Sequence, residues 1–303
     1  MVTMPLVSII MNCYNSDRFL KEAIDSVYSQ TYHRWEVIFW DNASTDQSAA
    51  IARSYDDRLK YFLALQTTPL GEARNLALGK AKGKYIAFCD CDDLYLPDKL
   101  EKQVQQLDNS DFPMSYGSAI IIDELGKVVR RRPVVNDSGT LLAPLLKRYE
   151  INIQSVMIRH AFLKENNLSF QANLKYSPDY NLFMTIASSY QIGVIKDYIV
   201  QYRVSKGALS NQSRHLVFNE NKFTLDQIVR KKPELKEKYL VAFQYAYAKL
   251  YYYEAVRYIV EGNYRKAREQ LTKTGWKRWE YMALYFLLWL RIPSKQIMKL
   301  LNR

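Results

Sequence analysis

The sequence has few cysteines, no long apolar run and no basic leader. Its three cysteines are Cys13, Cys89 and Cys91, and their spacing matches no CxxC motif, so we expect reduced thiols in a cytosolic setting. The longest apolar run is about ten residues (281–290), whereas a membrane-spanning helix needs about 20. Residues 1–6 carry no basic or long apolar stretch. We therefore expect neither a signal peptide nor a membrane crossing.

Glycine-rich phosphate loops are also missing. No GxGxxG follows the first predicted strand, and GxxxxGK[ST] occurs nowhere in the chain. A bound nucleotide would therefore need another means of neutralising its phosphates. A uniform basic charge is absent too, because residues 1–110 have a net charge of −3 and residues 111–303 a net charge of +15. This split argues against a nucleic-acid partner.

The composition is that of a globular protein, with 48% hydrophobic and 24% charged residues. Short apolar runs alternate with helical patterns over the first 110 residues, which predicts a mostly parallel α/β sheet with helices on both faces. The expected strands are 7–13, 35–40, 59–65 and 84–89, and the expected helices are 17–29, 45–55, 71–82 and 97–107. Beyond these we expect a hairpin over 117–129, strands over 155–159 and 193–204, a helix over 179–188, and only helices from about 215.

Polar side chains follow three of the predicted strands. They are Tyr14 and Asn15 after the first, Asp41 after the second, and Asp90 and Asp92 after the fourth. Ligands of open α/β sheets bind outside the carboxyl ends of the strands, so we expect these groups to face one crevice. Two carboxylates that bracket one residue can hold Mg²⁺ or Mn²⁺, although such a pair also occurs in solvated turns.

Four segments in this order resemble glycosyltransferase family 2, an inverting, nucleotide-sugar-dependent family with the GT-A fold. They are VSIIMNCYN (7–15), WDNASTD (40–46), LGEARNLAL (70–78) and FCDCDD (88–93), the last followed by LYLPDKLEKQ (94–103). The resemblance continues more loosely to about residue 210. It implies a catalytic domain over 1–214, with a nucleotide-binding half (1–110) and an acceptor and catalytic half (111–214), and a helical region over 215–303.

The resemblance also implies roles for single residues. Tyr14 would stack on the nucleobase, with Asn12 and Asn15 beside it, and Asp41 would pair with the imide N–H of the base. Arg74 would contact the nucleotide. Asp90 would hold the ribose side of the donor and contribute with Asp92 to the metal site. Asp179 would be the catalytic base, although an acid in the first turn of a helix is also favoured by the helix dipole alone.

Two positions depart from the family pattern. The catalytic aspartate often follows a glutamate, but here it follows Pro178. Many members carry a histidine two residues after a Tyr-Arg pair, whereas Val204 and Ser205 follow Tyr202 and Arg203 here. The second departure removes a side chain that could contact the metal or a phosphate.

The C-terminal region is basic and aromatic. Residues 215–303 hold 18 Lys and Arg against 8 Asp and Glu, and residues 276–292 mix tryptophan, tyrosine and leucine between basic residues. We therefore expect that the segment 276–303, which contains these residues, can lie in the interface of an anionic membrane. A subunit contact, as in a homodimer, and simple core packing are the alternatives.

The resemblance thus implies an enzyme that moves a sugar from a nucleotide-diphosphate donor, a UDP-sugar, to a hydroxyl of a lipid-linked surface glycan. It would use Mn²⁺ or Mg²⁺ and act in the cytoplasm, at the inner face of the membrane. Two alternatives stay open. One is a degenerate transferase that only recruits a partner, and the other is a nucleotidyltransferase that makes sugar nucleotides.

Overall fold

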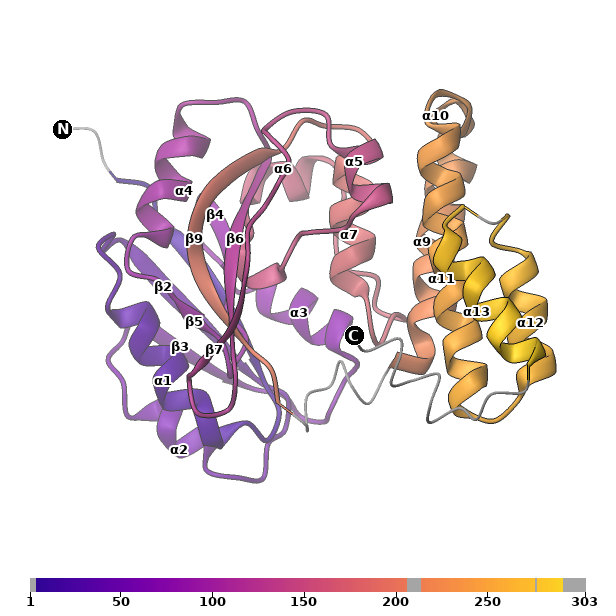
Figure 1. Ribbon diagram of the computed structural model, residues 1–303. Coiled ribbons are helices and arrows are strands. Elements are labelled where there is room, and N and C mark those ends of the chain that lie inside the picture. The colour runs from indigo at the N-terminus through magenta and orange to yellow at the C-terminus, as the bar shows by residue number, and fades with distance from the viewer. Residues whose placement is uncertain (1–3, 206–213, 276, 291–303) are drawn as a thin grey trace. The chain divides into compact units, whose positions relative to one another are not determined.

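The computed structural model describes residues 4–205, 214–275 and 277–290 (Figure 1). The chain forms two compact units. The first comprises the described residues of Met1–Leu141 and Glu150–Ala208, and the second those of Leu142–Tyr149 and Leu209–Arg303. The second unit thus takes up a short segment from the middle of the chain.

The first unit is built on a nine-stranded sheet whose first half is parallel. β1 (Val7–Cys13) pairs with both β2 (Trp35–Asp41) and β4 (Tyr85–Phe88), and β2 pairs with β3 (Leu59–Leu63). The order is β3-β2-β1-β4, and all four strands run the same way. The predicted α/β fold with a mostly parallel sheet is confirmed, and the carboxyl ends of these strands meet at one edge.

The second half of the sheet is mixed. β8 (Met157–Arg159) lies antiparallel to β4 and β6 (Met114–Ile122), while β6 runs parallel to β9 (Gly193–Arg203). β5 (Leu94–Tyr95) and β7 (Val128–Arg132) pair antiparallel with β9 and β6. The β6–β9 register shifts on both sides of Ser118, which bends the sheet.

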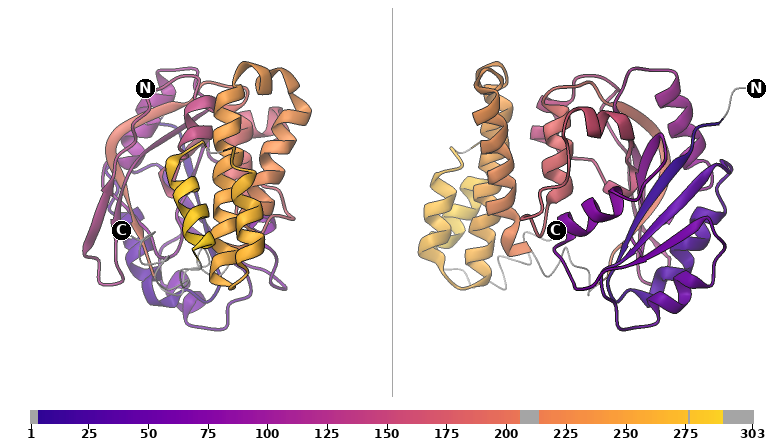
Figure 2. Two further views of the ribbon diagram at one scale, coloured as in Figure 1. Left: turned by 45° about the vertical axis from the view of Figure 1, so that its right-hand side comes forward. Right: turned by 180° about the vertical axis from the view of Figure 1, so that it is seen from behind.

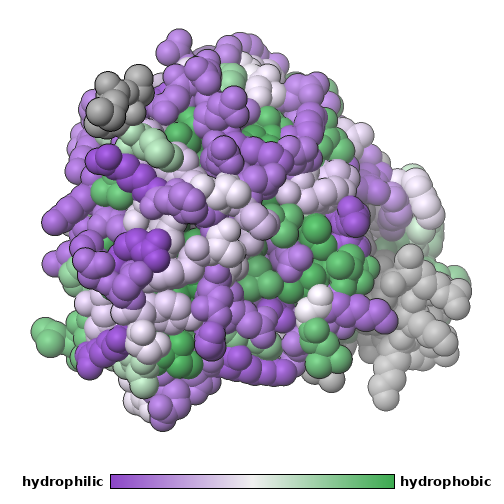
Figure 3. All heavy atoms as spheres, turned by 90° about the vertical axis from the view of Figure 1, so that its left-hand side faces the viewer, coloured by the Kyte–Doolittle hydropathy of each residue, from purple (hydrophilic) through white to green (hydrophobic). Residues whose placement is uncertain are grey.

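Helices cover both faces of this sheet (Figures 1 and 2). α1 (Asp17–Tyr28), α2 (Ser48–Arg53) and α4 (Lys99–Asp108) pack on one face over Val7, Ile9 and Met11. α3 (Leu70–Leu78) and α7 (Pro178–Ala187) lie on the other, together with the short α6 (His160–Glu165). Hydrophilic side chains predominate on the side of the first unit that Figure 3 shows, with fewer apolar ones among them.

Several element ends differ from the sequence predictions. The helix predicted over 71–82 ends at Leu78, because Gly79 caps it and the next residues form turns. The strand predicted over 59–65 ends at Leu63, where its pairing with β2 stops. Short elements such as β5, α6 and the 3₁₀ turn Ile153–Ser155 were not predicted, since they are too short to show a periodic pattern.

The second unit is helical, as predicted for the C-terminal extension. It contains α5 (Leu142–Lys147), a 3₁₀ turn (Arg214–Leu216), α9 (Val217–Lys231), α10 (Pro233–Lys238), α11 (Leu240–Val260), α12 (Tyr264–Thr272) and α13 (Trp279–Trp289). One core cluster joins α11, α12 and α13. None of the described helices combines the length and apolar character that crossing a bilayer requires.

Candidate functional site

The loops that follow β1 and β2 are tied together by Asn15. Its backbone N–H donates to Ser44 Oγ at 3.0 Å, and its side-chain Oδ1 accepts from the Thr45 N–H at 2.8 Å. Asn15 has a φ of 48°, a left-handed conformation that asparagine adopts more readily than most residues. The neighbouring Tyr14 side chain is left 53% exposed, so its ring is free to meet a ligand.

Asp41, at the end of β2, is fully buried. One of its oxygens accepts from the Tyr61 hydroxyl at 2.6 Å and the other from the Ser44 N–H at 2.7 Å. Burial raises the pKa of Tyr61 to about 12, and the hydrogen bond to Asp41 adds to the rise. Asp41 therefore fixes the Ser44 loop, and it would have to be uncovered before it could bond to a nucleobase directly.

Arg74 and Asp90 meet near the carboxyl ends of β1 and β4. Arg74 lies on α3, is 4% exposed, and places Nη2 3.4 Å from Asp90 Oδ1. The other oxygen of Asp90 accepts from Gln154 Nε2 at 2.6 Å. The Phe170 ring centroid lies 5.4 Å from the Arg74 guanidinium. Asp90 is thus held on both sides by residues distant in sequence.

Asp179 lies in the first turn of α7, where Pro178 opens the helix. Burial raises the pKa of Asp179; the positive charge of Arg74 opposes this rise and the negative charge of Asp90 adds to it. Both charges act on Asp179 because the fold brings α3, the end of β4 and the start of α7 together. Three predicted site residues from distant segments therefore share one locality.

The acidic loop (residues 90–93) carries three carboxylates, and Arg74 and Arg203 compensate their negative charge only in part. Burial raises the pKa of Asp92 to about 6, the charge of Asp90 adds to this rise, and Arg203 opposes it. Burial and the negative charges of Asp92 and Asp90 also raise the pKa of Asp93 well above its usual value. A bound cation would relieve this repulsion, so the donor chemistry of the loop suits a divalent metal.

The predicted metal site offers few protein ligands. No group of three or more His, Cys, Asp or Glu side chains that could hold a metal occurs among residues 4–205, 214–275 and 277–290. Asp90 and Asp92 are two carboxylates, and Mg²⁺ is commonly held by one or two carboxylates together with substrate phosphates. The loop therefore fits a metal that arrives with a diphosphate.

Asn12, on β1, has a buried amide nitrogen with no hydrogen-bond partner. Its backbone carbonyl accepts from the thiol of Cys91, at an S···O distance of 3.3 Å. This contact joins the end of β1 to the acidic loop. A buried amide without a partner is costly, and a carbonyl or phosphate oxygen of a ligand would satisfy it.

Two residues of this region were not singled out by sequence. Gln154, in the 3₁₀ turn, orients Asp90, but it lies 64 residues away in the chain, so no local pattern indicates it. Arg203, at the end of β9, donates from Nε to the carbonyl of Asp92 at 2.9 Å. The Tyr-Arg pair that contains Arg203 was recognised in the sequence, but its contact with the acidic loop was not.

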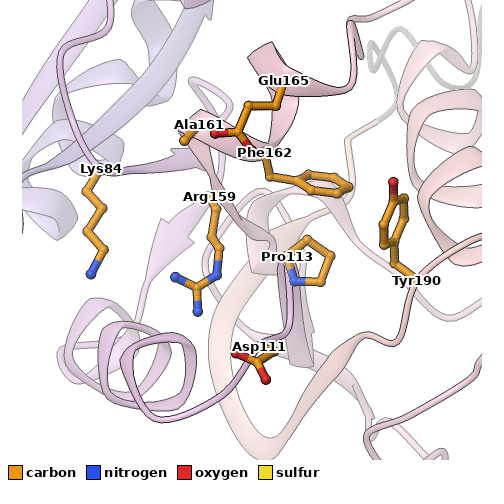
Figure 4. A pocket seen from close by; sticks show the side chains of 8 residues that line it. All are labelled: Lys84, Asp111, Pro113, Arg159, Ala161, Phe162, Glu165 and Tyr190. Carbon is orange, nitrogen blue, oxygen red and sulfur yellow. The ribbon is translucent and has the colours of Figure 1, made fainter.

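A pocket of about 310 Å³ lies at the other end of the strands (Figure 4). Lys84, which directly precedes β4, and Arg159, which pairs with Tyr85 at the start of β4, are among its lining residues. The guanidinium of Arg159 donates to the backbone carbonyls of Leu107, Ser110 and Phe112. None of the predicted site residues lines this pocket.

Comparison with known proteins gives concordant matches. The sequence profile of Glycosyl transferase family 2 matches residues 8–165. The chain is 30% identical over 212 residues to the Escherichia coli UDP-Glc:alpha-D-GlcNAc-diphosphoundecaprenol beta-1,3-glucosyltransferase WfgD, which covers 68% of this chain and 80% of WfgD. The fold is similar to the crystal structure of S. aureus TarS 1–349 in complex with UDP-GlcNAc, with a TM-score of 0.67 and 18% identity, over 93% of this chain and 86% of that one.

Other relatives are longer than this chain. An uncharacterized glycosyltransferase of Rickettsia felis is 31% identical over 239 residues, which is 78% of this chain and 38% of the relative. An uncharacterized glycosyltransferase of Rickettsia conorii gives the same coverage at 32% identity. The chain thus spans about 38% of the length of these two relatives.

Proposed function

The chain belongs to glycosyl transferase family 2, and we propose that it transfers a sugar from a UDP-sugar to a hydroxyl of a lipid-linked surface glycan, with inversion at the anomeric carbon. WfgD, whose name states a UDP-glucose donor and a diphosphoundecaprenol-linked acceptor, supports this choice of substrates. The observation that carries the proposal is the grouping of Arg74 and Asp179 with Asp90 of the acidic loop. In our proposal residues 1–214 form the catalytic domain.

Asp179 acts as the general base in this proposal. The acceptor oxygen forms a bond to the anomeric carbon, the bond from that carbon to the diphosphate oxygen breaks, and the acceptor proton passes to the Asp179 carboxylate. A base works best when its pKa approaches the operating pH. The raised pKa of Asp179 supports this role, and the positive charge of Arg74 favours the ionised form of the carboxyl group.

Asp90 and Asp92 would hold Mn²⁺ or Mg²⁺ together with the donor. Such a cation neutralises charge on the leaving diphosphate. Tyr14 would stack on the base, with Asn12, Asn15 and Asp41 around it, and Arg74 would contact the nucleotide. The 53% exposure of Tyr14 and the partnerless Asn12 amide favour a ligand at this edge of the sheet.

Calorimetric titration tests the donor site. We expect UDP to bind more tightly than GDP, dTDP or CMP, and the affinity for UDP to rise when Mn²⁺ is added. Binding of UDP without a response to Mn²⁺ would refute the metal site alone. No binding of any of the four nucleotides to the folded protein would refute the proposal and favour a degenerate transferase.

The variant Asp179→Asn tests the base. We expect it to bind UDP like the wild type while transfer to a diphosphoundecaprenol-linked GlcNAc acceptor falls at least about a hundredfold. The control is Glu280→Gln, which also removes an acid from the first turn of a helix, α13. Retained transfer in Asp179→Asn would reduce Asp179 to a favourable helix-terminal charge.

The second unit supplies the membrane contact in this proposal, which places the enzyme in the cytoplasm at the inner face of the membrane. One face of α13 is apolar and open, with Trp279, Met282, Phe286 and Trp289 exposed at 70%, 40%, 64% and 67%. We call these four residues the exposed face of α13. The described part of this unit carries 17 Lys and Arg against 8 Asp and Glu, which suits an anionic surface. Of the segment 276–303 considered above, residues 276 and 291–303 lie outside the described residues.

A further inference from the structure

Arg203 is the largest fully buried side chain of the described residues, although arginine is rarely buried. It lies at the end of β9 and binds the acidic loop at two points. Its Nε donates to the carbonyl oxygen of Asp92 at 2.9 Å, and its backbone N–H donates to Asp93 Oδ1 at 2.7 Å. One residue thus holds both the backbone and a side chain of the loop.

The rest of the guanidinium is anchored on two other elements. Nη1 faces the carbonyls of Asp123 and Glu124, in the turn between β6 and β7, at 3.3 and 3.5 Å. Nη2 donates to the Glu22 carboxylate of α1 at 2.7 Å. The guanidinium also lies over the Phe19 ring, 4.3 Å from its centroid. Because the planar guanidinium is hydrogen-bonded on several sides, it has little freedom to move. It therefore fixes the acidic loop relative to α1 and to the turn between β6 and β7.

The Asp92 carboxylate has no such support of its own. No side chain within the described parts of the chain donates a hydrogen bond to it, whereas Asp90 accepts a hydrogen bond from Gln154 and pairs with Arg74. The direction of the Asp92 side chain is therefore set by the backbone that carries it. That backbone is held by a tight turn, in which the Asp93 N–H bonds to the Asp90 carbonyl at 3.2 Å, and by Arg203.

We propose that Arg203 is a positioning residue, which holds the backbone of Asp92 so that its carboxylate meets the divalent cation of a nucleotide diphosphate. The inference rests on the proposed donor site. Arg203 needs no contact with the substrate for this role. A lysine at position 203 would keep the charge but would lose the fork that joins three elements.

The test compares Arg203→Lys with Arg159→Lys. Arg159 also gives its guanidinium N–H groups to backbone carbonyls of the first unit, but at the opposite end of the strands. We expect both variants to melt at lower temperature than the wild type. Only Arg203→Lys should weaken the binding of Mn²⁺. We expect its apparent affinity for Mn²⁺ to fall about tenfold, as happens when other residues that orient metal ligands are replaced. The affinity for Mn²⁺ is read by calorimetry in the presence of saturating UDP, and the metal-free affinity for UDP should not change.

A second variant covers the case that Arg203→Lys does not fold. Glu22→Gln removes one partner of Arg203 at a carboxylate that is 60% exposed, so folding should persist. We expect a smaller loss of Mn²⁺ affinity in the same direction. Wild-type affinity for Mn²⁺ in both variants, or an equal loss in Arg159→Lys, would overturn the inference. Failure of the wild type itself to bind UDP or Mn²⁺ would instead refute the proposed donor site, and the inference with it.

Discussion

Burying an ionised carboxylate in the acidic loop destabilises the folded protein, and Asp92 is the clearest case. The ionised form of Asp92 is disfavoured by burial and by the charge of Asp90, which raises its pKa to about 6. A side chain that stays charged where burial and like charges disfavour its ionised form lowers the stability of the fold. Such side chains are typical of active sites. This balance can be measured without any substrate.

We predict that Asp92→Asn stabilises the metal-free protein. Since the neutral amide avoids the repulsion from Asp90, the free energy of unfolding at pH 7.5 should rise by about 1–2 kcal/mol in chelator, a fraction of the value that the pKa change allows. Denaturant unfolding in EDTA measures this. The same variant should lose the increase in UDP affinity that Mn²⁺ gives. A less stable variant would mean that Asp92 makes favourable contacts in the metal-free fold.

Lys99 is a second buried charge, and it lies outside the proposed site. Its Nζ donates to Gln103 Oε1 at 2.7 Å and lies 4.2 Å from the Tyr95 ring centroid. Burial lowers the pKa of Lys99 to about 7, and the neighbouring Cys89 opposes this shift. Between pH 7 and the ordinary lysine pKa, the unfolded chain therefore binds more protons at this position than the folded protein does.

We predict that this difference makes the protein more stable as the pH rises. Because the unfolded state binds the additional proton, the free energy of unfolding should increase by about 1 kcal/mol per pH unit between pH 7 and 8.5. Urea unfolding at several pH values measures the slope. Lys99→Met should flatten it, and an unchanged slope in that variant would contradict the assignment to Lys99.

Helix α3 shows how an element positions the site. Gly71, in its first turn, lies so close to the 171–178 segment that a Cβ would stand 2.5 Å from the Gln171 carbonyl oxygen and 3.3 Å from Pro178 Cβ. Only glycine permits this approach. It places α3, which carries Arg74, directly against the segment that leads into Asp179.

We therefore predict that Gly71→Ala forces α3 away from α7. The free energy of unfolding should fall by about 1–3 kcal/mol, as in other overpacked sites, and transfer activity should fall with it. Gly79→Ala, at the C-cap of the same helix, is the control, because the added Cβ would meet its nearest atom at 3.4 Å and the φ of Gly79 is −63°. That variant should be neutral or more stable. Wild-type behaviour of Gly71→Ala would show that the segment yields easily.

At the scale of the whole molecule, the proposed membrane contact through α13 would determine where the protein meets a lipid-linked acceptor. The buried side of α13 packs Tyr281, Leu284 and Leu288 against α11 and α12. The opposite side is the exposed face of α13, whose members recur at helical spacing. Aromatic side chains in such numbers on an open surface are typical of contact with a membrane or a partner.

We predict that the purified protein floats with phosphatidylglycerol vesicles and not with phosphatidylcholine vesicles. The triple variant Trp279→Ser, Phe286→Ser, Trp289→Ser should bind at least about tenfold more weakly, since each aromatic ring contributes apolar burial. Leu125→Ser is the control, because Leu125 is 91% exposed in the first unit. The prediction fails if the wild-type protein does not bind the vesicles. If the wild type is then found to be a dimer and the triple variant a monomer, the exposed face of α13 is a subunit contact.

The α/β class, the parallel direction of the first strands and the family could all be predicted from the sequence, because they depend on local periodicity and on motifs in a fixed order. It also indicated Asp90, Asp92, Arg74 and Asp179 as site residues, since their neighbours in the chain carry the motifs. The partly exposed Tyr14 fits the role that the motif implies, although no observation tests that role.

The groups that support these residues could be identified only in the folded protein. Gln154 reaches Asp90 across 64 positions, Arg203 reaches Asp92 across 111, and Asp41 is covered by Tyr61. The parallel β6–β9 pairing that brings Arg203 to the acidic loop joins strands about 80 residues apart. Such contacts depend on how the whole chain packs, and no local pattern records them. The same holds for the exposed face of α13, because periodicity alone cannot tell an apolar face that is packed from one that is left open.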